Sequence, residues 1–232
     1  MLKIHHRNKS AGFTLIEILA AILLLTFFLS VTMQAMVIAA MFKVKAKRYS
    51  VATAWIQEDL ESVRNQASVL SQSLMSVSLS VAVGTPSTTV IIVDNIGTLA
   101  VNDKILIGDA GKIFTITSIT GTTITLNSYI GKTLVVGSKV IETTLCSATA
   151  TTNGFANALN NSLIPISTAN SKKSLASTTD QKYQITRTTT LKNASPYNVL
   201  EVLYKVTPEN KTTPVIATSF SEVIPDVSFY CP

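Results

Sequence analysis

Side chains that could carry chemistry are few in this chain, and the histidines are the most informative of them. His5 and His6 are the only two histidines, and both lie near the N-terminus. The rest of the chain therefore lacks the base of a histidine-assisted nucleophilic triad and the imidazoles of a histidine-ligated metal site. The sequence predicts no catalytic residue, no metal site and no cofactor, and we do not expect an enzyme.

Two cysteines, Cys146 and Cys231, could carry redox chemistry. They form no CxxC motif, so neither a zinc ribbon nor a thioredoxin-type site is expected. In an exported chain the two would form a disulfide closing a loop of about 85 residues, which the chain-entropy model values at roughly 4.5 kcal/mol. The alternative is that both remain buried free thiols.

Glu17 is the third candidate, because it interrupts a long apolar stretch near the N-terminus. No charged residue, proline or glycine lies between Glu17 and Lys43. As a helix this run would be about 37 Å long, enough to span a hydrocarbon core of ~30 Å. A carboxylate in hydrocarbon costs roughly 2.5–3.5 kcal/mol. We therefore expect Glu17 to have a partner, or else to be an interfacial residue at headgroup level.

Two simpler interpretations of the apolar segment fit less well. A secretory signal peptide has a shorter apolar core that is followed by a small-residue cleavage site. Here the small residues Ser10-Ala11-Gly12 precede the core. An ordinary single-pass anchor explains the length, but it does not explain a carboxylate so near the start.

Beyond the apolar run, the spacing of apolar residues predicts that the helix continues with one buried face. The stripe consists of Ala52, Ile56, Leu60, Val63, Ala67 and Leu70. Such three- and four-residue spacing is typical of an amphipathic helix. No proline or glycine interrupts residues 13–83, so we expect one helix of about 60 residues, roughly 90 Å long. Its first half would lie in lipid and its second half would pack on a folded domain.

The remaining sequence has the composition of β-structure. Short β-branched runs separated by glycine, proline and asparagine turns predict strands. These strands are expected at 90–93, 104–107, 112–119, 123–126, 183–191, 199–206, 215–223 and 227–230. The first four could form a small β module with a hairpin centred on Gly121, and the last four an antiparallel meander. Residues 147–180, rich in Ser, Thr, Asn and Ala, are expected to form a long surface loop.

The sequence Gly12-Phe13-Thr14-Leu15-Ile16-Glu17 follows a short basic leader and precedes the apolar run. This arrangement resembles the processing site of type IV prepilins and type II secretion pseudopilins, and the resemblance covers about residues 1–65. It implies that a prepilin peptidase cuts between Gly12 and Phe13 and that the new amine of Phe13 is methylated. It also implies that Glu17 pairs with the N-terminus of a neighbouring subunit.

The resemblance further implies an α+β pilin-like fold, in which a long transmembrane and amphipathic helix packs on an antiparallel sheet. The expected regions are a leader (1–12), a membrane and filament-core helix (13–42), its amphipathic continuation (43–83), a β-rich inserted module (84–145) and a loop with the C-terminal sheet (146–232). The cysteine pair is similar to the disulfide-bounded C-terminal region of pilins. The overall composition also resembles cyanobacterial pilin-like proteins of the hormogonium polysaccharide secretion group.

Partners and location follow from the same resemblance. Implied partners are other pilin subunits in a helical filament, the prepilin peptidase, an inner-membrane assembly platform and membrane lipid before assembly. The subunit would lie in the inner membrane before assembly, and in a periplasmic or extracellular filament afterwards. We expect a structural subunit, a minor pilin or pseudopilin. The alternative is a pilus-displayed adhesin or receptor for polysaccharide or DNA.

The net charge gives little support for nucleic-acid binding. The formal charge of +6 falls to +3 when the leader residues Lys3, Arg7 and Lys9 are removed. A second basic run, 43–48, follows the apolar span, so the charge count alone does not decide which side of the membrane is cytoplasmic. This run could contact lipid phosphates or an anionic polymer, or it could be a solvated helix surface.

Overall fold

The computed structural model describes residues 14–167, 171–175 and 182–231. Two compact units are present, Met1–Arg48 and Tyr49–Pro232. Helix α1 (Leu15–Leu74) contributes to both of them. The processing residues predicted above, Gly12 and Phe13, lie outside the described residues.

In the first unit, α1 is an uninterrupted helix that is apolar on every side. Its backbone is satisfied internally, as a membrane-spanning segment requires. Two of its polar side chains are also satisfied within the helix: the Thr26 hydroxyl donates to the Leu23 carbonyl at 2.9 Å, and that of Thr32 donates to the Phe28 carbonyl at 3.0 Å. By length and composition, α1 can cross a membrane.

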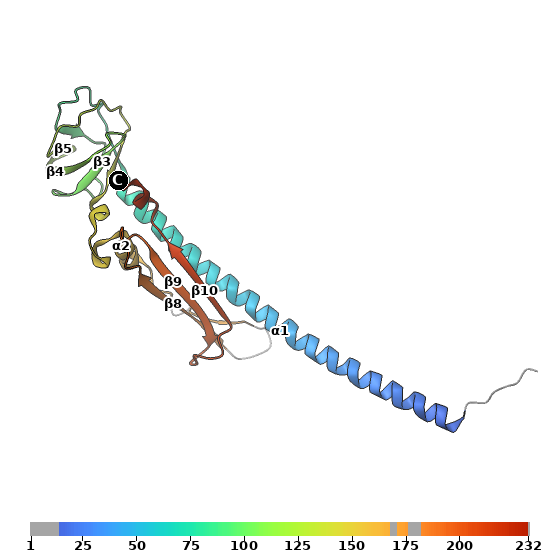
Figure 1. Cartoon of the computed structure of the whole chain (residues 1–232). Helices are drawn as coiled ribbons and strands as arrows, with labels where there is room; N and C mark the ends of the chain where they lie inside the picture. Colours follow the sequence, from blue (N-terminus) through green and yellow to red (C-terminus); the bar gives the residue numbers. More distant parts are fainter. Residues whose placement is uncertain (1–13, 168–170, 176–181, 232) are drawn as a thin grey trace, which may run out of the picture. The chain divides into compact units, whose positions relative to one another are not determined.

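In the second unit, α1 packs on an antiparallel sheet, which confirms the predicted α+β fold (Figure 1). The strands are β7 (Lys172–Ser174), β8 (Lys182–Leu191), β9 (Leu200–Pro208) and β10 (Ala217–Val223), in the order β10-β9-β8-β7. Alternate residues of β9 are fully buried, as a half-buried strand requires: Leu200, Val202, Tyr204 and Val206. They meet the buried stripe of α1, which comprises Ala52, Trp55, Ile56, Leu60, Val63 and Ala67.

The other sheet of this unit is six-stranded. It contains β1 (Val77–Ser78), β2 (Val90–Ile92), β3 (Lys104–Ile107), β4 (Ile113–Thr120), β5 (Thr123–Leu126) and β6 (Lys139–Glu142), in the order β1-β6-β3-β4-β5-β2. The predicted hairpin is confirmed as β4–β5, with Gly121 at a φ of +59° in its turn.

This six-stranded sheet closes into a small barrel. Leu79 forms an antiparallel bridge with Val93, and the Ser80 N–H donates to the Ile92 carbonyl at 3.0 Å, so the segment after β1 also pairs with β2. The interior is filled by a cluster of apolar side chains distinct from the helix–sheet core, including Phe114 and Ile116. Because the barrel has its own core, it has the organisation of a separate module.

A third apolar cluster connects the barrel to the chain's C-terminal end. Its buried members are Leu74, Ile141, Phe155 and Val227, contributed by α1, β6, α2 (Phe155–Ser162) and the 3-10 helix η3 (Asp226–Tyr230). Beside it, Cys146 in the 3-10 helix η1 (Thr144–Ser147) is bonded to Cys231, with an S–S distance of 2.00 Å. The predicted disulfide is therefore confirmed, and it joins the end of the barrel to the C-terminus.

Seven of the eight predicted strands are present with ends shifted by at most two residues. The prediction for 227–230 is wrong: this segment is η3, because Val227 enters the third apolar cluster and its N–H donates to the Ser71 hydroxyl at 3.2 Å. The loop predicted at 147–180 contains α2, the 3-10 helix η2 (Thr151–Asn153) and β7. In α2, Phe155, Ala156 and Leu159 are buried, and this packing selects helix in a Ser/Asn-rich segment.

The helix was expected to continue to residue 83, but α1 ends at Leu74. Val77, Leu79 and Val83 instead point into the barrel core, where they complete its closure. Burying an aliphatic side chain is worth about 1.5–3 kcal/mol, whereas the helix propensities of individual residues differ by less than about 1 kcal/mol. Barrel packing therefore determines where the helix ends.

The disulfide is expected to contribute substantially to stability. It closes a separation of 85 residues, for which the chain-entropy model gives about 4.5 kcal/mol. We expect Cys146→Ser/Cys231→Ser to lower the free energy of unfolding by several kcal/mol. Urea denaturation of the full chain in detergent, followed by the fluorescence of the single tryptophan, Trp55, measures this. Reducing agent should destabilise the wild type and leave the double variant unchanged, and a wild type equally stable after reduction would contradict the prediction.

Candidate assembly site

Glu17 lies in the first turn of α1, with an exposed side chain. The Thr14 carbonyl starts the helix by accepting from the Glu17 N–H at 3.0 Å. An acidic residue in this position is favoured by the partial positive charge of a helix N-terminus. Among the described residues, no basic side chain lies within ion-pair distance of Glu17. Its carboxylate is therefore available to a group from outside this part of the chain.

The helix that carries Glu17 presents apolar side chains in all directions. From Leu15 to Val44, the large apolar residues have 45–79% of their surface exposed. Exposed apolar surface of this extent marks a membrane or protein contact. Glu17 thus provides one carboxylate that can pair with a cation, on a helix that requires an apolar environment.

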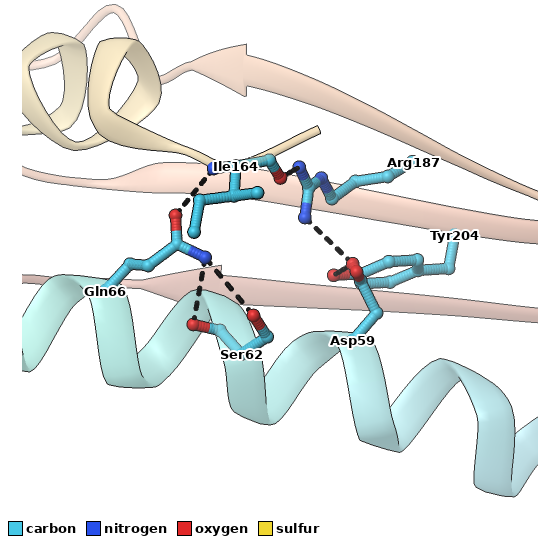
Figure 2. Close-up of polar contacts among 6 residues, drawn as sticks. All are labelled: Asp59, Ser62, Gln66, Ile164, Arg187 and Tyr204. Carbon is cyan, nitrogen blue, oxygen red and sulfur yellow. Dashed lines mark hydrogen bonds and ion pairs between the residues drawn. The ribbon is translucent and has the colours of Figure 1, made fainter. Parts of the chain in front are cut away.

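Polar contacts hold the second half of α1 on its sheet (Figure 2). The Asp59 carboxylate of α1 accepts from the Arg187 guanidinium of β8 at 2.9 Å and from the Tyr204 hydroxyl of β9 at 2.6 Å. Only 8% of the Arg187 side chain and 17% of the Asp59 side chain are exposed, so this ion pair is screened little by water. The pair sets the rotation and register of α1 on β8 and β9.

The same contacts extend to the segment that follows α2. The second terminal nitrogen of Arg187 donates to the Ile164 carbonyl at 2.6 Å, and the Ile164 N–H donates to the Gln66 side-chain oxygen at 2.7 Å (Figure 2). Gln66 is oriented in turn by donating to the Ser62 carbonyl at 3.3 Å. Helix, sheet and connecting segment are thus joined by side chains whose hydrogen bonds are directional.

Burial raises the pKa of the Tyr204 hydroxyl, and acceptance of its hydrogen bond by Asp59 raises it further. The tyrosine therefore stays protonated at neutral pH, as a donor to a carboxylate must. Arg187 partly opposes the shift because a nearby cation favours the tyrosinate.

Of the predicted site residues that the structure describes, Cys146 and Cys231 are brought together. Glu17 is placed at the start of α1, while Gly12 and Phe13 lie outside the described residues. Asp59, Arg187 and Tyr204 were not predicted. A usable signal existed for Asp59, because it follows Ile56 by three residues and precedes Val63 by four. That spacing puts a carboxylate on the edge of the apolar stripe.

Comparison with known proteins gives one match. Residues 7–33 match the family described as the prokaryotic N-terminal methylation motif. No curated protein and no solved structure gives a significant match to the chain. The motif is that of type IV pilins and pseudopilins, which are typically structural subunits rather than enzymes. The chain therefore carries a prepilin-type N-terminus, and the match contains Gly12, Phe13 and Glu17.

Removing one partner of the Asp59–Arg187 pair should destabilise the helix–sheet packing. We expect Arg187→Met to lower the free energy of unfolding by about 3 kcal/mol, because a buried carboxylate loses its cation. Asp59→Asn/Arg187→Met should recover at least about half of this loss, since the amide oxygen still accepts from Tyr204. Urea denaturation monitored by Trp55 fluorescence tests both variants. A double variant as unstable as the single one would show that the charge is not the cause.

Proposed function

We propose that this protein is a structural subunit, a minor pilin or pseudopilin, of a type IV pilus or type II secretion-like filament. The observation that supports this best is the exposed carboxylate of Glu17 in the first turn of an all-apolar helix, inside the matched methylation motif. In this proposal a prepilin peptidase removes the leader after Gly12, and the new amine of Phe13 is methylated.

Processing would create the charge that Glu17 requires. Cleavage converts the amide nitrogen of Phe13 into an ammonium group, and methylation leaves that positive charge in place. Within a bundle of apolar helices, the Glu17 carboxylate of one subunit would pair with the ammonium group of its neighbour. An unpaired buried charge is strongly unfavourable, so a neighbour in the wrong axial register would be rejected. The pair thus contributes specificity more than net stability.

The apolar surface of α1 would be covered twice in the life of the subunit. Before assembly it would be surrounded by inner-membrane lipid, since α1 is long and apolar enough to span a bilayer. During assembly an ATP-driven platform would transfer it into the core of a periplasmic or extracellular filament. The membrane part of α1 contains neither Gly nor Pro, so it resists local unwinding, which favours a minor pilin or pseudopilin.

A second function, display of a binding module, is supported by the barrel. Its core is separate from the helix–sheet core, and its two ends meet where Val77 pairs with Val140. Apolar side chains are exposed on the barrel at Val81, Val135 and Val136, where they do not serve its packing. These features suit an adhesin or receptor module carried on a filament subunit.

Replacing Glu17 should separate processing from assembly. We expect Glu17→Gln to be cleaved and methylated normally but to be incorporated into filaments at least tenfold less, because an amide cannot neutralise the neighbouring ammonium group. Mass spectrometry of the N-terminus reports processing, and the subunit content of sheared filaments reports assembly. Glu61→Gln, which neutralises an exposed carboxylate on the same helix, is the matched control. Normal incorporation of Glu17→Gln would refute the pairing role.

Gly12 should be required for removal of the leader. We expect Gly12→Lys to leave the full-length precursor, because a long charged side chain blocks the approach of a protease to the backbone at the junction. An electrophoretic shift and the intact mass detect the uncut chain. Gly84→Lys is the control, since a Cβ atom added there meets no atom within 4 Å. Efficient cleavage of Gly12→Lys would place the junction elsewhere.

Removing the barrel should show whether it serves in surface binding or in filament assembly. Residues 78–139 can be deleted by joining Val77 to Val140 through an Asn-Gly turn. These two residues are already paired in the antiparallel strands β1 and β6, so a two-residue turn can connect them. We expect filaments to form with this variant at wild-type levels and surface adhesion to fall. Retained adhesion would assign the barrel no binding role. Loss of filaments in a variant whose Trp55 fluorescence is native would give the barrel a role in assembly instead.

A further inference from the structure

We propose that Lys43, Lys45, Lys47 and Arg48 form a basic collar that binds the phosphates of anionic lipid headgroups. The collar lies at the carboxyl-terminal end of the apolar part of α1. The inference rests on the proposed function in one respect, because it requires α1 to lie in a bilayer before assembly.

The charge of the basic collar is not neutralised by neighbouring residues. The three lysine side chains are exposed, and Arg48 is partly exposed. Within the described residues, none of the four lies within ion-pair distance of a carboxylate. No acidic residue occurs between Glu17 and Glu58. Four cations within one and a half helical turns are therefore available to anions from outside the chain.

The position of the collar along α1 matches a headgroup layer. The uncharged run of about 37 Å covers a hydrocarbon core of ~30 Å and reaches the interface beyond it. From Lys43 to Arg48 the helix rises about 7.5 Å. A bilayer of about 40–45 Å with a ~30 Å core leaves roughly 5–8 Å for the headgroups of each leaflet. The collar thus occupies the depth at which lipid phosphates lie.

The distribution of the charges around the helix suits lipid better than a single protein partner. At about 100° per residue, Lys47, Arg48 and Lys45 lie roughly 40°, 140° and 200° from Lys43 around the axis. A docking surface for one protein would place its charges on one face, whereas these cover more than half of the circumference. Lipids surround a single helix and can satisfy cations that point in different directions.

Aromatic residues border the collar at both ends. Phe42 precedes it and Tyr49 follows it, with 66% and 56% of their surfaces exposed. Tyrosine is enriched at membrane interfaces, where its ring and hydroxyl meet apolar and polar surroundings. The alkyl stems of the lysines can lie along the apolar helix while their ammonium groups reach the phosphates. A guanidinium can in addition bind a phosphate through two parallel hydrogen bonds.

A lipid competition experiment tests the collar. The full chain is reconstituted with equal amounts of phosphatidylglycerol and phosphatidylcholine, and native mass spectrometry gives the ratio of the two bound lipids. We expect the wild type to prefer phosphatidylglycerol and Lys43→Gln/Lys45→Gln/Lys47→Gln to lose this preference, by roughly fivefold for each lysine removed. Increasing salt should reduce the wild-type preference.

The control variant removes three exposed lysines from the folded unit, Lys139→Gln/Lys205→Gln/Lys211→Gln. It should keep the wild-type preference, since its charges lie outside the collar. Equal binding of the two lipids by the wild type, or an unchanged preference in the collar variant, overturns the inference. Retention of the wild type in vesicles after alkaline extraction is measured in parallel. If the chain is retained but shows no lipid preference, only the collar fails. If it is extracted, the membrane-anchored function fails as well.

Discussion

The rest of this structure depends on the need to cover an apolar helix that carries one carboxylate. The two parts have opposite requirements: the helix exposes apolar side chains on all faces and is unfavourable in water, whereas the Glu17 carboxylate is unfavourable in any apolar environment that covers the helix. In lipid the carboxylate can remain at the interface. In the proposed filament, only a positive charge at the matching height removes its cost, so the same group that limits burial would select the register of assembly.

The second half of α1 is subject to a different requirement, because it must pack on its domain in a single orientation. The apolar stripe around Val63 provides most of the attraction, but apolar packing alone tolerates small rotations and shifts. The Asp59 pair with Arg187 and the Tyr204 hydrogen bond remove this tolerance, since each requires a specific distance and direction (Figure 2). The orientation of the domain on α1 is therefore set by polar contacts within an apolar interface.

The barrel and the disulfide add a module without opening a new edge. Pairing of Leu79 with Val93 closes the barrel, and a closed barrel has no free strand edge at which sheets could aggregate. The Cys146–Cys231 disulfide then attaches the segment that follows the last barrel strand, β6, to the C-terminal segment. In the proposed filament, where subunits would be closely packed, a barrel without a free strand edge would not pair with the strands of its neighbours.

The sequence by itself determined the elements that depend on local pattern: the apolar span, the amphipathic stripe, the β4–β5 hairpin and the position of Glu17 before the span. Hydrophobic period and turn residues act over a few positions, so they can be recognised without the fold. Only the tertiary structure decided that α1 ends at Leu74, that 226–230 is helical, and that Asp59 meets Arg187. The last two residues are 128 positions apart. Contacts over such separations form only after the chain has packed, so no local pattern encodes them.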